Sequence, residues 1–120
     1  MKTETLDKLF SQFKRLSSGG YCGKCGKFVG YSNLQNAHFF GRWRHVVRWD
    51  KRNTIPLCLD CHQEIDLNAV AKAELALSLM NRDEYDELAR LADKTIKDFP
   101  IDKKALAKEF REGIKRLQNL

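Results

Sequence analysis

The sequence predicts an α+β fold with one N-terminal helix, a compact ββα-like centre stapled by a metal ion, and about three C-terminal helices. Three observations predict it. The four cysteines form two C-x-x-C pairs, the glycines gather in the first half of the chain, and apolar residues recur at helical spacing near both ends. At 120 residues the chain has the size of one compact domain, and we expect residues 1–20, 21–66 and 67–120 to be its three parts.

The first part is predicted to be an amphipathic helix over residues 4–16. Its apolar residues recur at helical spacing, at Leu6, Leu9, Phe10, Phe13 and Leu16. Two serines and two glycines follow at 17–20, and such a cluster ends a helix.

The central part is rich in loop-forming residues. Residues 21–26 should form a tight turn that carries Cys22 and Cys25, and residues 28–31 and 34–40 are expected to pair as two short strands of a hairpin. The segment after Pro56, which carries Cys58 and Cys61, is expected to enter a helix.

The last part is predicted to be helical throughout. Residues 67–80 are apolar on most sides, so we expect a buried helix. Asn81 and Glu84 have the spacing of a capping box that begins a second helix, and Asp102 can cap a third. The apolar stripe of that third helix is Leu106, Phe110, Ile114 and Leu117.

The cysteine spacing predicts one structural zinc ion per chain, bound by Cys22, Cys25, Cys58 and Cys61. Two C-x-x-C pairs supply the four thiolates of a closed tetrahedral zinc site, and no cysteine is left over. Disulfides are less expected in a cytoplasmic protein. A redox dithiol of the thioredoxin type would need a βαβ setting, which this pattern lacks.

The net charge of +6 is concentrated around the cysteines and histidines. Residues 22–62 carry seven basic and two acidic side chains, whereas residues 63–120 carry eleven and twelve. A merely solvated surface would spread the charge evenly, so the localised patch indicates a polyanionic partner. No apolar run approaches the ~18 residues of a membrane span, and the first residues lack the apolar stretch of a signal peptide. We therefore expect a cytoplasmic protein without a membrane partner.

The three histidines, His38, His45 and His62, all lie in this basic centre. A lone histidine is more often structural than functional, but two of these have informative neighbours. His38 precedes Asn53, which lies in the loop before the second cysteine pair, and His62 directly follows Cys61. In this order the chain resembles the HNH (ββα-metal) endonuclease superfamily. The runs N-A-H-F-F at 36–40 and R-W-D-K-R-N-T-I-P-L-C at 48–58 are similar to the lambda NinG (Rap)-type recombination nucleases.

The resemblance implies a metal-dependent endodeoxyribonuclease. His38 would be the general base that takes a proton from the attacking water, and Asn53 would brace the loop that aims it. His62 would bind a catalytic Mg²⁺ or Mn²⁺, which neutralises the phosphate and stabilises the departing 3′ oxygen. The substrate implied is branched or recombination-intermediate DNA in a bacterial or phage-infected cell, cut to 5′ phosphate and 3′ hydroxyl ends.

One position departs from the family pattern. Many HNH enzymes have Asp directly before the base histidine, as a second metal ligand, and this chain has Ala37. Asn36 and Asp50 are the nearby residues that could supply the missing ligand, and Mg²⁺ often binds through few protein ligands.

A basic and aromatic segment lies between the two functional candidates. The candidates for DNA contact are Arg42, Trp43, Arg44, Arg48, Lys51 and Arg52. Arginine pairs with phosphate oxygens in a forked geometry, and tryptophan stacks on unpaired bases. The alternatives are solvated arginines and a tryptophan, Trp43 or Trp49, that fills the core. His45 could contact phosphate or simply pack.

Two other functions stay open from the sequence. The chain could be a zinc-dependent DNA-binding module without catalysis, in which His38 and His62 are structural, and Ala37 favours that reading. It could also be an HNH nuclease of the restriction or homing type, which would need sequence-specific contacts. A homodimer is a further possible assembly, because symmetric cutting of a junction suits a two-fold axis.

Overall fold

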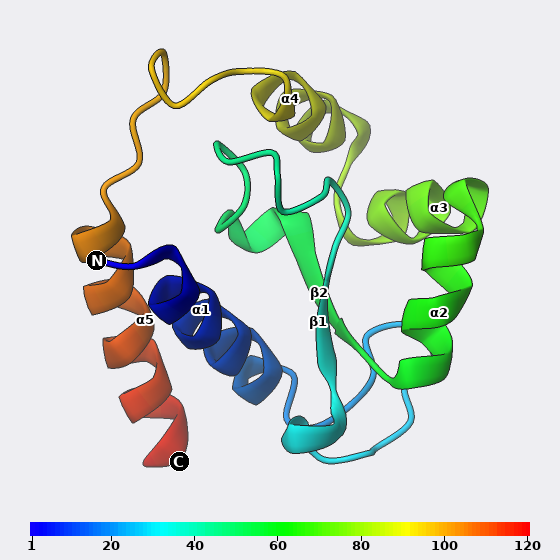
Figure 1. Ribbon diagram of the computed structural model, residues 1–120. Coiled ribbons are helices and arrows are strands. Elements are labelled where there is room, and N and C mark those ends of the chain that lie inside the picture. The colour runs from blue at the N-terminus through cyan, green and yellow to red at the C-terminus, as the bar shows by residue number, and fades with distance from the viewer.

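A computed structural model describes residues 1–120 and has five α-helices and one two-stranded sheet (Figure 1). The elements are α1 (Thr3–Ser17), β1 (Gln35–His38), β2 (Thr54–Leu57), α2 (Leu59–Leu67), α3 (Ala69–Leu79), α4 (Arg82–Ala92) and α5 (Lys103–Gln118). The predicted α+β class is confirmed, with one helix before the sheet and three helices after α2. No helix has the length and apolar character needed to cross a membrane.

The sheet joins segments that are distant in the sequence. β1 and β2 are antiparallel, with Ala37 opposite Ile55 and His38 opposite Thr54, and α2 follows β2 almost directly. The predicted hairpin between residues 28–31 and 34–40 is therefore wrong. Residues 28–31 form no strand, and Phe28 makes only an isolated bridge to Tyr21. Gly30 has a φ of +82°, a left-handed conformation that interrupts extended backbone.

Three helices form where their sequences predict. α1 buries Leu6 and Phe10 of its apolar stripe. α4 begins with a complete capping box, because the side chains of Asn81 and Glu84 each accept a hydrogen bond from the other residue's backbone N–H. The Asp102 side chain accepts from the backbone N–H of Ala105 at 3.0 Å and so caps α5.

The apolar segment 67–80 differs from the prediction of one buried helix. It is divided at Asn68, whose side chain accepts a hydrogen bond from the backbone N–H of Ala71 and starts α3 there. Only one side of α3 packs on the protein, where Leu75 and Ala76 are buried. Leu67 and Val70 are 89% and 66% exposed, so much of the apolar surface faces outward.

The core consists of two separate clusters. The larger one joins the sheet to α2, α3 and α4 and includes Cys22 and Cys61. The smaller one lies between α1 and α5, where the rings of Phe10 and Phe110 are 5.0 Å apart and Trp49 is buried against them. Figure 1 shows α1 and α5 side by side on one side of the sheet and α2 and α3 on the other.

Candidate functional site

The four cysteines meet at one point, and their Sγ atoms all lie within 4.8 Å of one another. Cys22 and Cys25 come from the turn at 21–26, and Cys58 and Cys61 come from the beginning of α2. None of them forms a disulfide. A side chain at Gly23 would collide with Ile55 on β2, so glycine lets the first pair approach the second.

A bound cation would favour ionisation of the thiols. Burial raises the pKa of the Cys61 thiol, so this residue is neutral without a positive partner. Burial also opposes ionisation of Cys22, but backbone N–H groups of Cys58, Cys25 and Lys24 outweigh it and lower the pKa of Cys22 to about 6. Four thiolates so close together require a divalent cation between them. The cluster could therefore hold one structural zinc ion.

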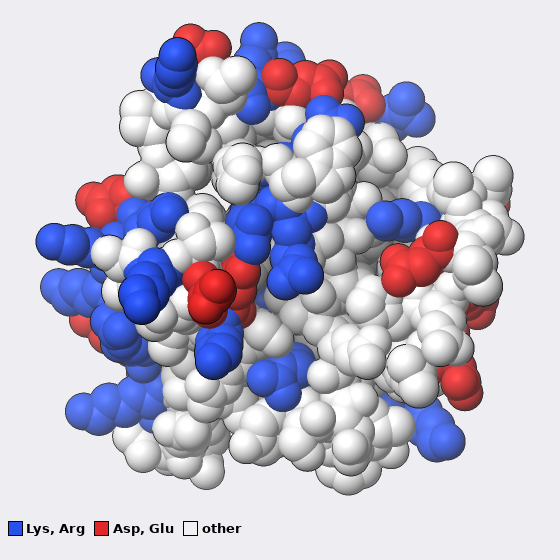
Figure 2. Space-filling model, viewed as in Figure 1, with Lys and Arg blue, Asp and Glu red and all other residues white.

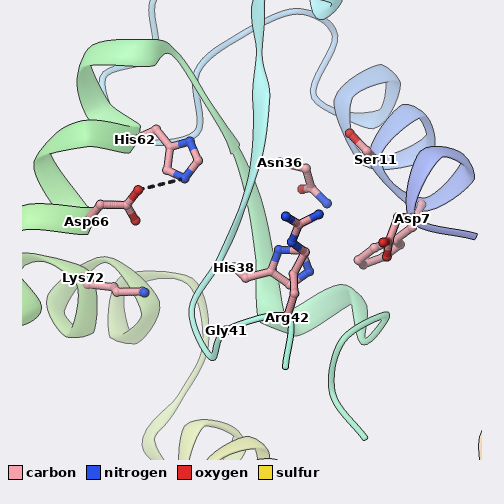
Figure 3. Close-up of a pocket in the computed structure, with 10 residues that line it drawn as sticks. Asp7, Ser11, Asn36, His38, Gly41, Arg42, His62, Asp66 and Lys72 are labelled. Carbon is pink, nitrogen blue, oxygen red and sulfur yellow. Dashed lines mark ion pairs between the residues drawn. The ribbon is translucent and has the colours of Figure 1, made fainter. Parts of the chain in front are cut away.

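A second candidate site is a pocket on the side of β1 that carries Asn36 and His38, between α1 and the α2–α3 pair. The pocket has a volume of about 440 Å³, and nine of its ten lining residues are polar, charged or glycine. Figure 3 shows His62, Asp66 and Lys72 on one side and Asp7 and Ser11 of α1 on the other, with Asn36, His38 and Arg42 between them. The structure thus brings the two predicted working histidines to one pocket.

One ring nitrogen of His38 is hydrogen-bonded to the protein, and the other is not. Nε2 lies 2.9 Å from the carbonyl oxygen of Arg48, and because a carbonyl only accepts, Nε2 carries the proton. Nδ1 is then an unprotonated nitrogen with no protein partner. Burial lowers the pKa of His38 and outweighs the hydrogen bond to the Arg48 carbonyl, which raises it; the charges of Arg42 and Arg48 lower the pKa further, and that of Asp7 opposes them. The side chain is therefore neutral near pH 7, as a general base requires.

Asn53 holds the loop that connects the strands and carries Arg48. The residue is fully buried. Its Oδ1 accepts from the backbone N–H of Phe40 at 2.8 Å, and its Nδ2 donates to the carbonyls of Phe40 and Val47 at 2.9 and 3.0 Å. Its backbone carbonyl also accepts from the N–H of Phe39 at 2.8 Å. Asn53 does not reach the pocket, and its contacts are those of a brace.

His62 is oriented in a way that suits a metal ligand. Nδ1 lies 2.5 Å from the side-chain oxygen of Gln35, which accepts a hydrogen bond from the Nδ1–H group. Nε2 is then the ring nitrogen left for a metal, and it lies 3.4 Å from a carboxylate oxygen of Asp66, one helical turn further along α2. Metal-binding histidines commonly donate their second N–H to an oxygen in this way. A nitrogen and a carboxylate thus face the same point of the pocket.

The structure shows where Ala37 and the two candidates for a further metal ligand lie. Ala37 is buried in the larger core, on the opposite side of β1 from its neighbour His38, so this position does not face the pocket. Asn36 does line the pocket, and its Oδ1 is buried without a hydrogen-bond partner. Asp50 lies elsewhere and binds Arg52. Of the two candidates for a further ligand, the geometry favours Asn36.

Two cations of the pocket have no protein partner, Arg42 from the long loop and Lys72 from α3. The other basic candidates each have one. The pairs are Arg44 with Asp93, Arg48 with Asp7, Lys51 with Glu109, and Arg52 with Asp50 and Glu87. Figure 2 shows basic side chains gathered in the middle of the face that Figure 1 presents. Arg42 and Lys72 are the two that remain available to a phosphate in the pocket.

The two tryptophans have different environments. Trp49 is buried, and its indole N–H donates to Asp7 at 2.9 Å. Trp43 is exposed beside the pocket-lining residues Gly41 and Arg42. His45 is also exposed and lies outside the pocket.

Several pocket residues were not predicted, notably Asp7, Asp66 and Lys72, and neither was Gln35, which lies outside the pocket but contacts His62. Asp66 had a detectable signal, because a residue four positions after His62 lies on the same face of a helix. Gln35 and Lys72 had none, since their approach to His62 depends on how β1 and α3 pack beside α2.

No family model, no curated protein and no solved structure matches this chain. Its function must therefore be argued from the cysteine cluster and the pocket themselves.

Proposed function

We propose that the protein is a metal-dependent endodeoxyribonuclease of the HNH type, with a zinc-stapled ββα core. The observation that carries the proposal is the meeting of His38 and His62 in one pocket, each with one ring nitrogen within hydrogen-bond distance of an oxygen that can only accept. One supplies a base and the other a ligand. A purely structural pair of histidines would not need this complementary arrangement.

The proposed reaction is hydrolysis of a phosphodiester bond. Nδ1 of His38 takes a proton from a water molecule as the water oxygen attacks the scissile phosphorus. The bond between phosphorus and the 3′ oxygen breaks, leaving 5′ phosphate and 3′ hydroxyl ends. The Arg48 carbonyl fixes the ring during this step, and Arg42 and Lys72 are placed to neutralise charge on the phosphate.

The donor set fits a catalytic Mg²⁺ or Mn²⁺. His62 and Asp66 would hold the ion, and the unpartnered Oδ1 of Asn36 offers a third ligand from β1. A divalent cation bound there would neutralise the phosphate and stabilise the departing oxygen. Asp66 thus supplies the acidic ligand that Ala37 lacks, and this weakens the case for a module that binds DNA without cutting it.

Cleavage of labelled DNA tests the proposal. A four-way junction and a linear duplex are incubated with the protein in Mg²⁺, Mn²⁺ or EDTA. We expect metal-dependent cutting that is lost in His38→Ala and kept in His45→Ala, since His45 lies outside the pocket. Binding without cutting in every metal would favour the non-catalytic zinc module. Equal cutting of junction and duplex would refute only the preference for branched DNA.

A further inference from the structure

Trp43 is the most exposed aromatic residue of the chain, with 68% of its surface accessible. Large aromatic side chains usually contribute to a core, as Trp49 does here. An indole left outside the core exposes apolar surface to water, and such surface commonly marks an interaction site. The surroundings of Trp43 identify the partner.

The indole is held in a fixed position by its own loop. The guanidinium carbon of Arg44 lies 3.9 Å from the ring centre of Trp43, which is cation–π stacking. Arg44 is itself anchored at the end of α4, where it donates to the carbonyl of Ala92 at 3.3 Å and to Asp93 at 2.7 Å. One face of the indole is therefore backed by a cation that is hydrogen-bonded to the end of α4.

Gly41 leaves room for the edge of the same ring. A Cβ atom at this position would lie 2.7 Å from Nε1 of Trp43, so any larger residue would displace the indole. Exposed side chains normally retain rotamer freedom, and a contact partner must then overcome its loss. Here the loop has already restricted the ring before a partner arrives.

The indole is next to the pocket through Gly41. Trp43 does not line the pocket, but the edge of its ring lies against Gly41, which does. A depression of about 290 Å³ also borders Trp43, and its lining includes Arg44, His45 and Lys94 together with Asp93, Ala92 and Ile96. An aromatic face among basic residues suits a nucleic-acid base better than an apolar protein surface.

We propose that the indole of Trp43 is a preorganised stacking platform for an unpaired DNA base, one or two nucleotides from the phosphate held in the pocket. The proposal rests on the nuclease function proposed above, because the pocket supplies the reference phosphate. Bases of a continuous duplex are already stacked on each other and offer no free face. The platform therefore selects DNA with unpaired bases next to the cut, such as flaps and gaps.

Binding measurements in the His38→Ala background test the platform without cleavage. The probes are a duplex with a short unpaired gap that carries 2-aminopurine in the gap, and the same duplex fully paired. We expect 2-aminopurine fluorescence to fall when the parent protein binds, because the base stacks on the indole. Trp43→Ala should abolish that change and weaken binding of the gapped DNA about 5- to 100-fold, with little effect on the paired duplex.

Two variants serve as controls. Trp43→Phe keeps an aromatic face and should retain most of the affinity for gapped DNA. Phe28→Ala removes an aromatic ring of similar exposure, 61%, outside the pocket, and should leave the preference unchanged. Because Trp43 is exposed, Trp43→Ala should melt like its parent, and the melting curve shows whether the variant is folded.

The possible results separate this proposal from the nuclease function. Equal binding of both DNAs by Trp43→Ala and its parent would assign the indole to a protein contact and overturn the platform. If binding of gapped DNA depends on Trp43 but the unaltered protein cuts no DNA in any metal, the platform is supported and the nuclease function is refuted. If metal-dependent cutting is equal for gapped and paired DNA and is unchanged by Trp43→Ala, the nuclease function is supported and the platform is refuted.

Discussion

Asn53 and Phe40 exchange two hydrogen bonds, one in each direction between the buried side-chain amide and the Phe40 backbone. The pair closes the long loop between β1 and β2 at its base. The same loop carries the Arg48 carbonyl that holds the ring of His38. Closure of this loop and alignment of the His38 ring are therefore coupled.

Replacing Asn53 by alanine should destabilise the protein and misalign His38. The change leaves buried groups of Phe40 and Val47 without partners, so we expect the free energy of unfolding to fall by about 2–4 kcal/mol. Urea unfolding followed by circular dichroism measures it. Asn33→Ala is the matched control, because Asn33 is exposed and donates one hydrogen bond; a loss as large as that of Asn53→Ala would contradict the brace.

His38 should remain neutral below its ordinary pKa of 6.5, because burial lowers the pKa in the folded chain. The folded state then binds this proton less readily than the unfolded state. The contribution of His38 to stability is complete above pH 6.5 and is lost as the pH falls from there through the lower, folded-state pKa. NMR titration without added divalent metal measures the midpoint, with the signal assigned by its absence in His38→Ala. Arg42→Gln removes a nearby positive charge and should raise the midpoint; a midpoint at or above 6.5 in the parent would contradict the burial effect.

Removal of zinc should unfold the centre of the protein. Structural zinc sites in small peptides contribute about 10–16 kcal/mol, which is comparable to the whole stability of a domain, about 5–15 kcal/mol. Elemental analysis should find one zinc per chain, and a strong chelator should abolish the cooperative thermal transition. If the chelated protein keeps its melting curve, the cysteine cluster does not hold a structural metal.

Asp66→Asn should weaken metal binding more than it affects the fold. Asp66 is exposed and its contact in the fold is with His62, so the melting curve should change little. Loss of one ligand charge should raise the Mg²⁺ concentration for half-maximal cleavage about 10- to 100-fold. Glu74→Gln is the control, because Glu74 is an exposed acid on α3 outside the pocket. An unchanged Mg²⁺ requirement in Asp66→Asn would remove this residue from the metal site.

Lys72 and Arg42 should each contribute a phosphate contact. Removing either one should reduce the slope of log affinity against log salt concentration by about 0.9, the value for one phosphate contact on duplex DNA. Lys104→Ala on the exposed surface of α5 should leave the slope unchanged. Fluorescence anisotropy at several salt concentrations measures all three, and a Lys72→Ala slope equal to that of the parent would place Lys72 outside the DNA contact.

The helices with strong local signals could be predicted from the sequence, because their causes are local. The apolar period of α1, the Asn81 capping box of α4 and the Asp102 cap of α5 each lie within one or two turns. The cap at Asn68 obeys the same rule and was detectable, but the apolar residues around it suggested one continuous buried helix.

The strand pairing could not be predicted from local pattern. β1 pairs with a segment that lies beyond the long loop and contains Pro56, a residue that usually weakens a strand prediction. The Asn53 amide supplies the closing contacts, and these exist only once the loop has folded. The cysteine cluster was predictable from spacing alone, whereas the approach of Gln35 to His62 depends on this pairing.

The packing of α1 on α5 has a consequence for synthesis of the chain. α1 is made before α5 and contributes one wall of the pocket, but its buried face is covered by Phe110 and its neighbours in α5. A nascent chain can close its cysteine cluster early, yet its pocket keeps an unsupported wall until α5 emerges. The order of synthesis thus delays a competent pocket until α5 has docked.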